Sequence, residues 1–374
     1  MTRLRSFRGS LAPALFVALL SGPLLAAPAE RPVEKSFGSE IRTIEIENLV
    51  GRVEIRQAAS GRVAATVRAE ASAGKTGGEW TQAVDVEFEQ RGDRLVVKAI
   101  YPLDQHRRYH YPALNDDETF EPEWLASFID AGSTSSDYQG RRVKVVRHAG
   151  SDTPTLWADF ALEVPAGVAV RVKNLVGNIR STGVSGDQRL DSGSGTIDST
   201  GGRGALSADT GSGDIVVADH EGDIVADTGS GDVRLTEVRA ESIEADTGSG
   251  DVRMERVSGA INASTGSGDV IGRELTVGRR LRADTGSGDV RLGGDFAAVR
   301  DLMIDTGSGD VALTLSAIPS VQLVVSTGSG DVDVDVSAMR IRRSKDEFVA
   351  DLGSAEGSAS IDTGSGDVTV REGR

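Results

Sequence analysis

Apolar and polar residues alternate with a period of two in many short segments of this chain, and each segment ends at a glycine-rich turn. Around one such turn, Ile243, Ala245 and Thr247 share one side, and the next residues on that side are Val252 and Met254. A period of two is typical of a β-strand. Because the step from Thr247 to Val252 is odd, the alternation cannot pass straight through the glycines. We therefore predict two strands joined by a corner, where glycine reaches positive φ without steric cost.

The same unit recurs along the C-terminal part of the chain. The motif D-T-G-S-G-D-[VI] and its variants occur in nine copies, which begin at Asp191, Asp209, Asp227, Asp246, Ser264, Asp284, Asp305, Ser326 and Asp362. Successive copies start 18 to 21 residues apart, except for a last interval of 36, which is twice 18. A unit with two short strands buries its apolar face only by stacking on its neighbours.

This repeat predicts an all-β fold, a single-stranded parallel β-helix (solenoid) with coils of 18–21 residues. Parallel strands of successive coils would lie about 4.8 Å apart, with equivalent residues stacked in ladders. We expect right-handed winding, as in most parallel crossovers. Left-handed triangular β-helices remain an alternative, because coils of 18 residues also suit them.

An isolated Asp-Thr-Gly-Ser segment behind apolar residues, as at Asp227, is similar to the catalytic loop of pepsin-like aspartic proteases. That chemistry uses two carboxylates that share a proton. Nine copies in one chain do not fit a catalytic pair. We therefore interpret the motif as architectural.

The repeated carboxylates form two predicted ladders on the outside of the coils. One ladder precedes the corners and comprises Asp209, Asp227, Asp246, Asp284, Asp305 and Asp362. The other follows them and comprises Asp214, Asp232, Asp251, Asp269, Asp289, Asp310, Asp331 and Asp367. We expect each Asp to accept hydrogen bonds from the following Gly and Ser amides, and corner Thr and Ser hydroxyls to form ladders of their own. No cofactor is expected, and the alternative is that the Asp ladders bind Ca²⁺, which prefers carboxylate and carbonyl oxygens.

Residues 1–29 read as a secretory signal peptide. Arg3, Arg5 and Arg8 precede an apolar run that ends in small residues, and cleavage is expected near Ala26 to Ala29. A membrane span is the weaker interpretation, since Pro13 interrupts the run. Loss of the three arginines would change the formal charge from −16 to −19, which disfavours nucleic acid as a partner.

Composition limits the means by which the exported chain is held together. It has no Cys, so disulfides and an N-terminal lipidated Cys are excluded. With 46 Gly and 4% aromatic residues, a narrow core of Val, Ile, Leu and Ala is expected. We expect no transmembrane span in the mature chain, and a location in the periplasm, at the cell surface or outside the cell.

The N-terminal region, residues 30–100, reads as degenerate coils, because "ENLVGRVEI" at 47–55 echoes "KNLVGNIRS" at 173–181. A first β layer is expected to begin near Phe37 and to resume near Leu156, ahead of the repeats in residues 151–374. Alternation of apolar and polar residues also predicts strands at 63–69, 84–89 and 95–100.

An insertion at residues 101–150 interrupts this pattern, with a short helix predicted from Pro122 to Asp130. One interpretation is a lid that covers an end of the β-helix. The other is a binding surface for a sugar or an acidic partner, formed by His106, Arg107, Arg108, Tyr109, Tyr111 and Trp124. His106 and His110 have the spacing of a zinc pair only if that segment is helical, so no metal is expected there.

The D-T-G-S-G-D-V repeats, together with "FALEVPAGVAVRVKNLVGNIRS" at 160–181, resemble the bacterial putative-adhesin family of exported β-strand repeat proteins, related to autotransporter adhesin head domains. The resemblance covers roughly residues 37–370. It implies a β-helix and an envelope or surface role, and it brings no established activity or ligand.

We therefore predict an exported, nonenzymatic protein, an adhesin-like surface or a structural scaffold of the cell envelope, with an unidentified envelope, surface or carbohydrate ligand. The mature chain offers no Ser-His-Asp spacing, P-loop or cysteine nucleophile, and His148 and His220 are expected at the surface. A carbohydrate-active β-helix enzyme and a periplasmic sensor of envelope state remain alternatives.

Overall fold

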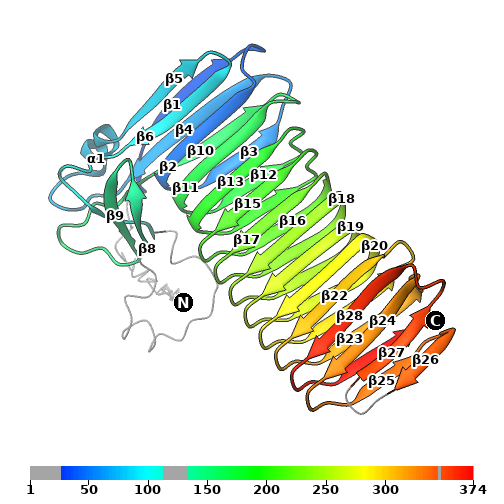
Figure 1. Cartoon of the computed structure of the whole chain (residues 1–374). Coiled ribbons are helices and arrows are strands. Elements are labelled where there is room, and N and C mark those ends of the chain that lie inside the picture. Colours follow the sequence, from blue (N-terminus) through cyan, green and yellow to red (C-terminus); the bar gives the residue numbers. More distant parts are fainter. Residues whose placement is uncertain (1–26, 113–133, 344–346, 374) are drawn as a thin grey trace, which may run out of the picture.

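The computed structural model describes residues 27–112, 134–343 and 347–373. The described chain is all-β apart from one short helix, and its main sheet of 26 strands winds into an elongated solenoid, shown in Figure 1. The predicted fold class is confirmed. The hand of the winding stays a prediction.

The solenoid has two faces, each a ladder of hydrogen-bonded strands that we name face A and face B. Face A runs, in spatial order, through β5 (Asp85–Arg91), β6 (Arg94–Ile100), β2 (Thr43–Val50), β11 (Ala169–Val176), β13 (Gln188–Ser194), β15 (Leu206–Thr210), β17 (Ile224–Thr228), the C-terminal halves of β18 (Val233–Thr247), β19 (Val252–Thr265) and β20 (Val270–Thr285), then β22 (Asp301–Thr306), β28 (Gly357–Thr363), β24 (Val321–Thr327), β27 (Glu347–Leu352) and β26 (Arg340–Arg343).

Face B lies opposite and is joined to face A through the glycine corners. It runs through β1 (Ala29–Phe37), β4 (Gly61–Ala69), β10 (Leu156–Val164), β3 (Val53–Gln57), β12 (Ile179–Thr182), β14 (Ile197–Thr200), β16 (Ile215–Glu221), the N-terminal halves of β18 to β20, β21 (Val290–Asp295), β23 (Val311–Ala317), β29 (Val368–Glu372) and β25 (Val332–Asp335).

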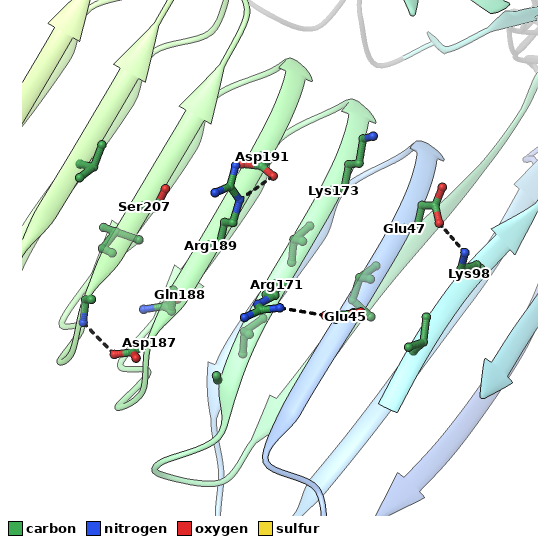
Figure 2. Close-up of a pocket in the computed structure, with 18 of the residues that line it drawn as sticks. Glu45, Glu47, Lys98, Arg171, Lys173, Asp187, Gln188, Arg189, Asp191 and Ser207 are labelled. Atoms are coloured by element: carbon green, nitrogen blue, oxygen red, sulfur yellow. Dashed lines mark hydrogen bonds and ion pairs between the residues drawn. The ribbon is translucent and has the colours of Figure 1, made fainter. Parts of the chain in front are cut away.

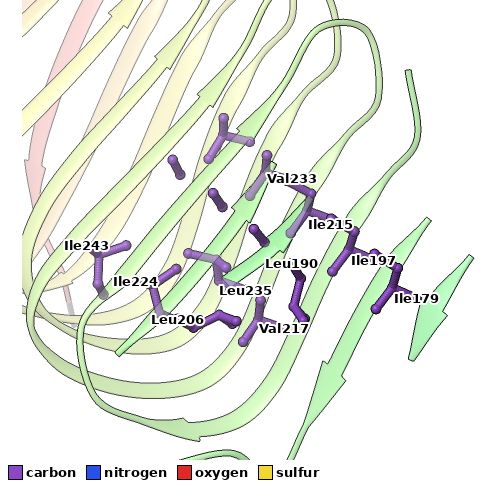
Figure 3. Close-up of a cluster of buried hydrophobic side chains, with 14 of the residues drawn as sticks. Ile179, Leu190, Ile197, Leu206, Ile215, Val217, Ile224, Val233, Leu235 and Ile243 are labelled. Carbon is purple, nitrogen blue, oxygen red and sulfur yellow. The ribbon is translucent and has the colours of Figure 1, made fainter. Parts of the chain in front are cut away.

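The core is a column of aliphatic side chains between the two faces, as Figure 3 shows. Ile197 stacks on Ile215 and Ile215 on Val233 in face B, while Leu206 stacks on Ile224 in face A. The predicted inward register is confirmed around Asp246, where every predicted inward residue is at most 3% exposed. Each rung thus extends one continuous apolar interior, which stabilises the stack by the area it removes from water.

Most corner glycines of the repeats are required for a different reason from the one predicted, although Gly195, in the copy at Asp191, does have positive φ. Gly229 and Gly231 do not have positive φ. Instead, a Cβ on Gly231 would lie 2.0 Å from the carbonyl oxygen of Gly213 in the preceding coil. The coils stack backbone on backbone at the corner, and only hydrogen fits between them.

The last coil is not last in space. β28 pairs with β22 on one side and with β24 on the other, and β29 likewise pairs with β23 and β25. The coil of β28 and β29, formed last along the chain, therefore lies in space between the coil of β22 and β23 and that of β24 and β25. Between these steps, the antiparallel strands β27 and β26 add to the edge beyond β24. The doubled interval of 36 residues reflects this return.

Antiparallel strands also form the N-terminal end of the solenoid. β10 lies between β3 and β4 and runs antiparallel to β4, which in turn pairs with β1. The predicted strands at 63–69, 84–89 and 95–100 lie within or overlap β4, β5 and β6. The first strand begins at Ala29, eight residues before the predicted start at Phe37, and residues 1–26 of the predicted signal peptide lie outside the described residues.

The insertion contributes a small sheet of β7 (Arg108–His110), β8 (Thr134–Tyr138) and β9 (Arg141–Val146). The helix α1 (Gly77–Ala83) precedes β5 and has a capping box between Thr76 and Glu79. The predicted helix at 122–130 lies outside the described residues. No helix in the described ranges is long and apolar enough to cross a membrane.

Candidate functional site

Threonine in the repeated motif binds one coil to the next. Thr247 is buried, and its Oγ1 donates to the carbonyl of Gly231 at 2.7 Å and accepts from the amide of Gly250 at 3.1 Å. The same pair of hydrogen bonds recurs at Thr210, Thr228, Thr265, Thr285, Thr306, Thr327 and Thr363. The predicted ladder of hydroxyls is therefore a ladder of hydroxyl–backbone bonds.

The Asp after each corner also joins neighbouring coils. Oδ1 of Asp232 accepts from the amide of Asp251 at 2.8 Å, and the same contact repeats from Asp214 to Asp331 with distances of 2.7–2.9 Å. Asp214, Asp232, Asp251, Asp269, Asp289, Asp310 and Asp367 all accept in this way. Acceptance from the following Gly amides, predicted for the Asp before the corner, is wrong: the amide of Gly229 donates to the carbonyl of Thr210, and that of Gly231 to Oγ1 of Thr228.

Arginines neutralise part of this second ladder on face B. Arg234 bridges Asp214 and Asp232, at 2.7 Å from each, and Arg253 bridges Asp232 and Asp251. Arg291 does the same for Asp269 and Asp289. The repulsion between stacked carboxylates is thus offset by interleaved guanidinium groups and by backbone amides.

The Asp before each corner forms the other ladder, on the outer face of face A. Asp209 stacks on Asp227, Asp227 on Asp246, and further along Asp284, Asp305 and Asp362 are adjacent. Partial burial and neighbouring carboxylates raise the pKa of Asp209, Asp246 and Asp305 above the ordinary range. This ladder holds like charges at close range. Ser264 separates Asp246 from Asp284 in the stack.

We expect Asp246→Ser to raise the melting temperature at pH 7 and low salt. A carboxyl with a raised folded-state pKa destabilises the fold when ionised, so the gain should fade as the pH falls through that pKa and as salt screens the ladder. The converse variant, Ser264→Asp, should lower the melting temperature under the same conditions. Thermal melts at two salt concentrations measure both, and equal melting temperatures for all three proteins would contradict the expectation.

The side chains of the two Asp ladders are not grouped as metal ligands in the described residues. Among residues 27–112, 134–343 and 347–373, no group of three or more His, Asp or Glu side chains is arranged to hold a metal ion. Binding of Ca²⁺ by the ladders stays a prediction. His110 is the last residue of β7 and His106 precedes that strand, so the two do not share a helix and the helical zinc spacing is not formed. Nδ1 of His110 lies 3.0 Å from Oγ1 of Thr155.

The predicted binding residues of the insertion divide into two groups. Tyr109 and Tyr111 are buried, and Tyr109 packs edge-on against Tyr101 with ring centroids 5.5 Å apart. His106 packs against Trp80. Only Arg107 and Arg108 are exposed among the described members, and Trp124 lies outside the described residues. The rings of Tyr109 and Tyr111 therefore serve packing in this structure, and a binding surface that includes Arg107, Arg108 and Trp124 stays a prediction.

A groove that the sequence did not predict lies on the outer face of face A, over β6, β2, β11, β13, β15 and β17. Its volume is about 810 Å³. Figure 2 shows two ion pairs between neighbouring strands, Lys98 with Glu47 at 2.9 Å and Arg171 with Glu45 at 3.2 Å. A third pair, Arg189 with Asp191 at 3.2 Å, lies along β13. Five acidic and five basic side chains line the groove, whereas the Asp ladder continues from one end of it.

Two lining residues are free to meet a ligand. Lys173 lies on β11, the strand that also carries Arg171; it is exposed and has no ion pair in the described part of the chain. Val225 is 44% exposed and adds an apolar surface at the end of the groove nearest the Asp ladder. The groove thus offers both signs of charge and an apolar contact to an extended ligand.

A polar cluster around His220 lies among the aliphatic residues of the interior. His220, predicted at the surface, is 2% exposed, and its Nε2 contacts the carbonyl of Gly204 at 3.0 Å. Gln188 is also buried and its Oε1 accepts from Ser181. His220 Nδ1, Gln188 Nε2 and Ser199 Oγ are buried without a partner in the described chain. Desolvation lowers the pKa of His220.

We expect the buried imidazole to make stability depend on pH. A base with a lowered folded-state pKa takes up protons on unfolding, so the free energy of unfolding should fall as the pH drops below about 6.5. In His220→Gln this fall should be smaller between pH 7 and pH 5. His148→Gln, at an exposed position, is the matched control and should keep the wild-type slope. Identical slopes in all three proteins would contradict the assignment.

Comparison with known proteins relates part of the repeat region to one protein family. No curated protein matches the chain. One solved structure that is similar is a "putative cell adhesion protein" from Clostridium sporogenes, with 9% identity over 92% of this chain and 100% of that chain, and a TM-score of 0.18. That score is too low to support an inference. Residues 203–371, from the loop before β15 to β29, match the family model described as Toastrack DUF4097, so the regular coils and the C-terminal end of the solenoid are similar to this family.

Proposed function

We propose that this protein is an exported, nonenzymatic scaffold that presents the outer face of face A as an adhesin-like binding surface. The observation that supports this proposal most is that the Thr side chain of the repeated motif, and the Asp side chain after each corner, form hydrogen bonds between coils. Side chains committed to backbone bonds in this way hold a rigid platform.

The groove on face A is the proposed contact site. Paired charges of both signs and the exposed Val225 suit an extended ligand that itself carries both signs of charge, such as a segment of a surface protein. The lining includes no aromatic residue on which a sugar ring could stack. The similarity to Toastrack DUF4097 is compatible with a β-repeat scaffold, and the relation to autotransporter head domains stays a prediction.

Fractionation with protease shaving of intact cells tests the exported location. We expect the protein outside the cytoplasm, and a cytoplasmic pool alone would overturn the proposal. Binding of the purified protein to arrays of surface peptides and glycans should then be weakened at least tenfold by Lys173→Glu. Arg282→Glu, an exposed face A variant outside the groove, is the matched control. Turnover of uronate-containing polysaccharides would instead support the enzyme alternative.

A further inference from the structure

Face A ends in an edge strand at each end of the molecule. Within the described chain, β5 pairs only with β6 at the N-terminal end, and β26 pairs only with β27 at the C-terminal end. Figure 1 shows β5 and β26 at opposite ends of the solenoid. An edge strand offers backbone N–H and C=O groups to a further strand, and natural proteins usually blunt such edges.

The two edges carry opposite charges in matching positions. On β5, Asp85, Glu87 and Glu89 are exposed and alternate with the inward residues Val86 and Phe88. On β26, Arg340 and Arg342 are exposed and flank Ile341. The register of Ile341 with the buried Ala350 places Ile341 on the inward side of the sheet.

Apolar surface is left uncovered at the basic edge. Ile341 is 56% exposed although it lies on the inward side, and the preceding Met339 is 82% exposed. At the acidic edge, Phe88 is half-buried. A strand placed beside β26 with an apolar inward residue would cover Ile341, and β5 has such residues at alternate positions.

Strand directions allow the two edges to pair antiparallel. β6 runs parallel to β2, so β5, antiparallel to β6, runs against the direction of the coils. β27 is antiparallel to β24 and β26 is antiparallel to β27, so β26 runs with the coils. Two copies stacked end to end in the same orientation therefore bring β26 of one copy antiparallel to β5 of the next.

In this arrangement one register pairs opposite charges on the outer side and covers Ile341 with the largest inward apolar residue of β5. Arg340 would lie opposite Glu89, Ile341 opposite Phe88 and Arg342 opposite Glu87. Opposite charges and apolar residues in directly opposed positions each stabilise an antiparallel pair. A register shifted by one residue would place arginine against phenylalanine.

Face B lacks this complementarity. Its N-terminal edge strand β1 contains Pro32, which has no amide proton to donate. The outward residues of β1 include Glu30 and Glu34, and those of β25 at the other end are Asp333 and Asp335. Like charges would face each other there, so pairing is confined to face A.

We propose that a second copy of this chain occupies the β26 edge through its β5 strand, which gives head-to-tail association of solenoids. The contact is heterologous, so it extends to short linear chains of copies and does not close at a dimer. A pair of strands this short buries far less than the roughly 1,200 Å² of a stable interface, so association is weak and depends on concentration and salt.

Sedimentation velocity of the full chain over a range of concentrations at low salt tests the proposal. We expect oligomers at high concentration that dissociate when salt is added. Arg342→Glu and Glu87→Arg should each abolish association, because each places like charges in opposition. The double variant Arg342→Glu/Glu87→Arg restores an opposite pair between copies and should restore association.

Arg282→Glu makes the same charge change in the middle of face A and should associate as the wild type does. Circular dichroism shows whether each variant is folded, and recovery in the double variant separates loss of contact from misfolding. A wild-type protein that stays monomeric at every concentration would overturn the proposal. So would single variants that associate normally, or a double variant that does not recover.

Discussion

Gly231→Ala is expected to destabilise the solenoid by more than about 3 kcal/mol, among the larger effects of a single methyl group. The new Cβ would lie 2.0 Å from the carbonyl oxygen and 2.4 Å from the carbonyl carbon of Gly213. Both are backbone atoms of the adjacent coil, so no side chain can rotate away. The coils would have to separate, which lengthens the Thr and Asp bonds at that corner.

Gly293→Ala is the matched control for this prediction. Gly293 lies in β21 of the same solenoid, and a Cβ there would meet its nearest atom at 3.8 Å. Chemical denaturation should show little change for this variant and a large loss for Gly231→Ala. Equal stability of the two variants would mean that the coils do not stack as closely at the corner as the structure has them.

Thr247→Val is expected to cost about 2–4 kcal/mol, because it removes a hydroxyl that satisfies two backbone groups. The carbonyl of Gly231 and the amide of Gly250 would lose their partner in a site where Thr247 is 1% exposed. Valine has nearly the same shape, so the loss reports the hydrogen bonds rather than a cavity.

The comparison variant is Thr247→Ser, which keeps the hydroxyl and removes one methyl group. We expect it to lose about 1 kcal/mol from the smaller buried surface. Denaturation curves of the two variants and the wild type give the ranking. If the valine variant were as stable as the serine variant, the hydroxyl would not hold the coils together.

Much of the fold follows from the sequence because the pattern is local. The alternation around each D-T-G-S-G-D motif predicts both strands and the corner, and residues such as Ile243 and Val252 are buried as expected. The order of the last coils does not follow. The copies at Ser326 and Asp362 present the same corner chemistry, so either could stack on the copy at Asp305. The strands β26 and β27 between them bring the final coil back.

The hydrogen bonds of the motif could not be predicted from the sequence, because they depend on which residues of neighbouring coils are paired. Oδ1 of Asp232 could have reached its own turn, and only the stacked structure shows that it accepts from Asp251. The face A groove likewise joins β6, β2 and β11, which are distant in sequence. His220 could have been found by aligning the repeats, because it occupies the position of the buried Val238 in the next coil.

Disulfide cross-linking tests the stacking of the coils most directly, since the native chain contains no Cys. Met303 and Ser360 are direct neighbours on the outer side of face A, and Val324 lies one strand beyond Ser360. Neighbouring parallel strands place Cα atoms about 5 Å apart, within disulfide range, whereas two strands away exceeds it. The stacking order predicts rapid oxidation of Met303→Cys/Ser360→Cys and none of Met303→Cys/Val324→Cys. The reverse result would contradict it and place the coils in simple sequence order.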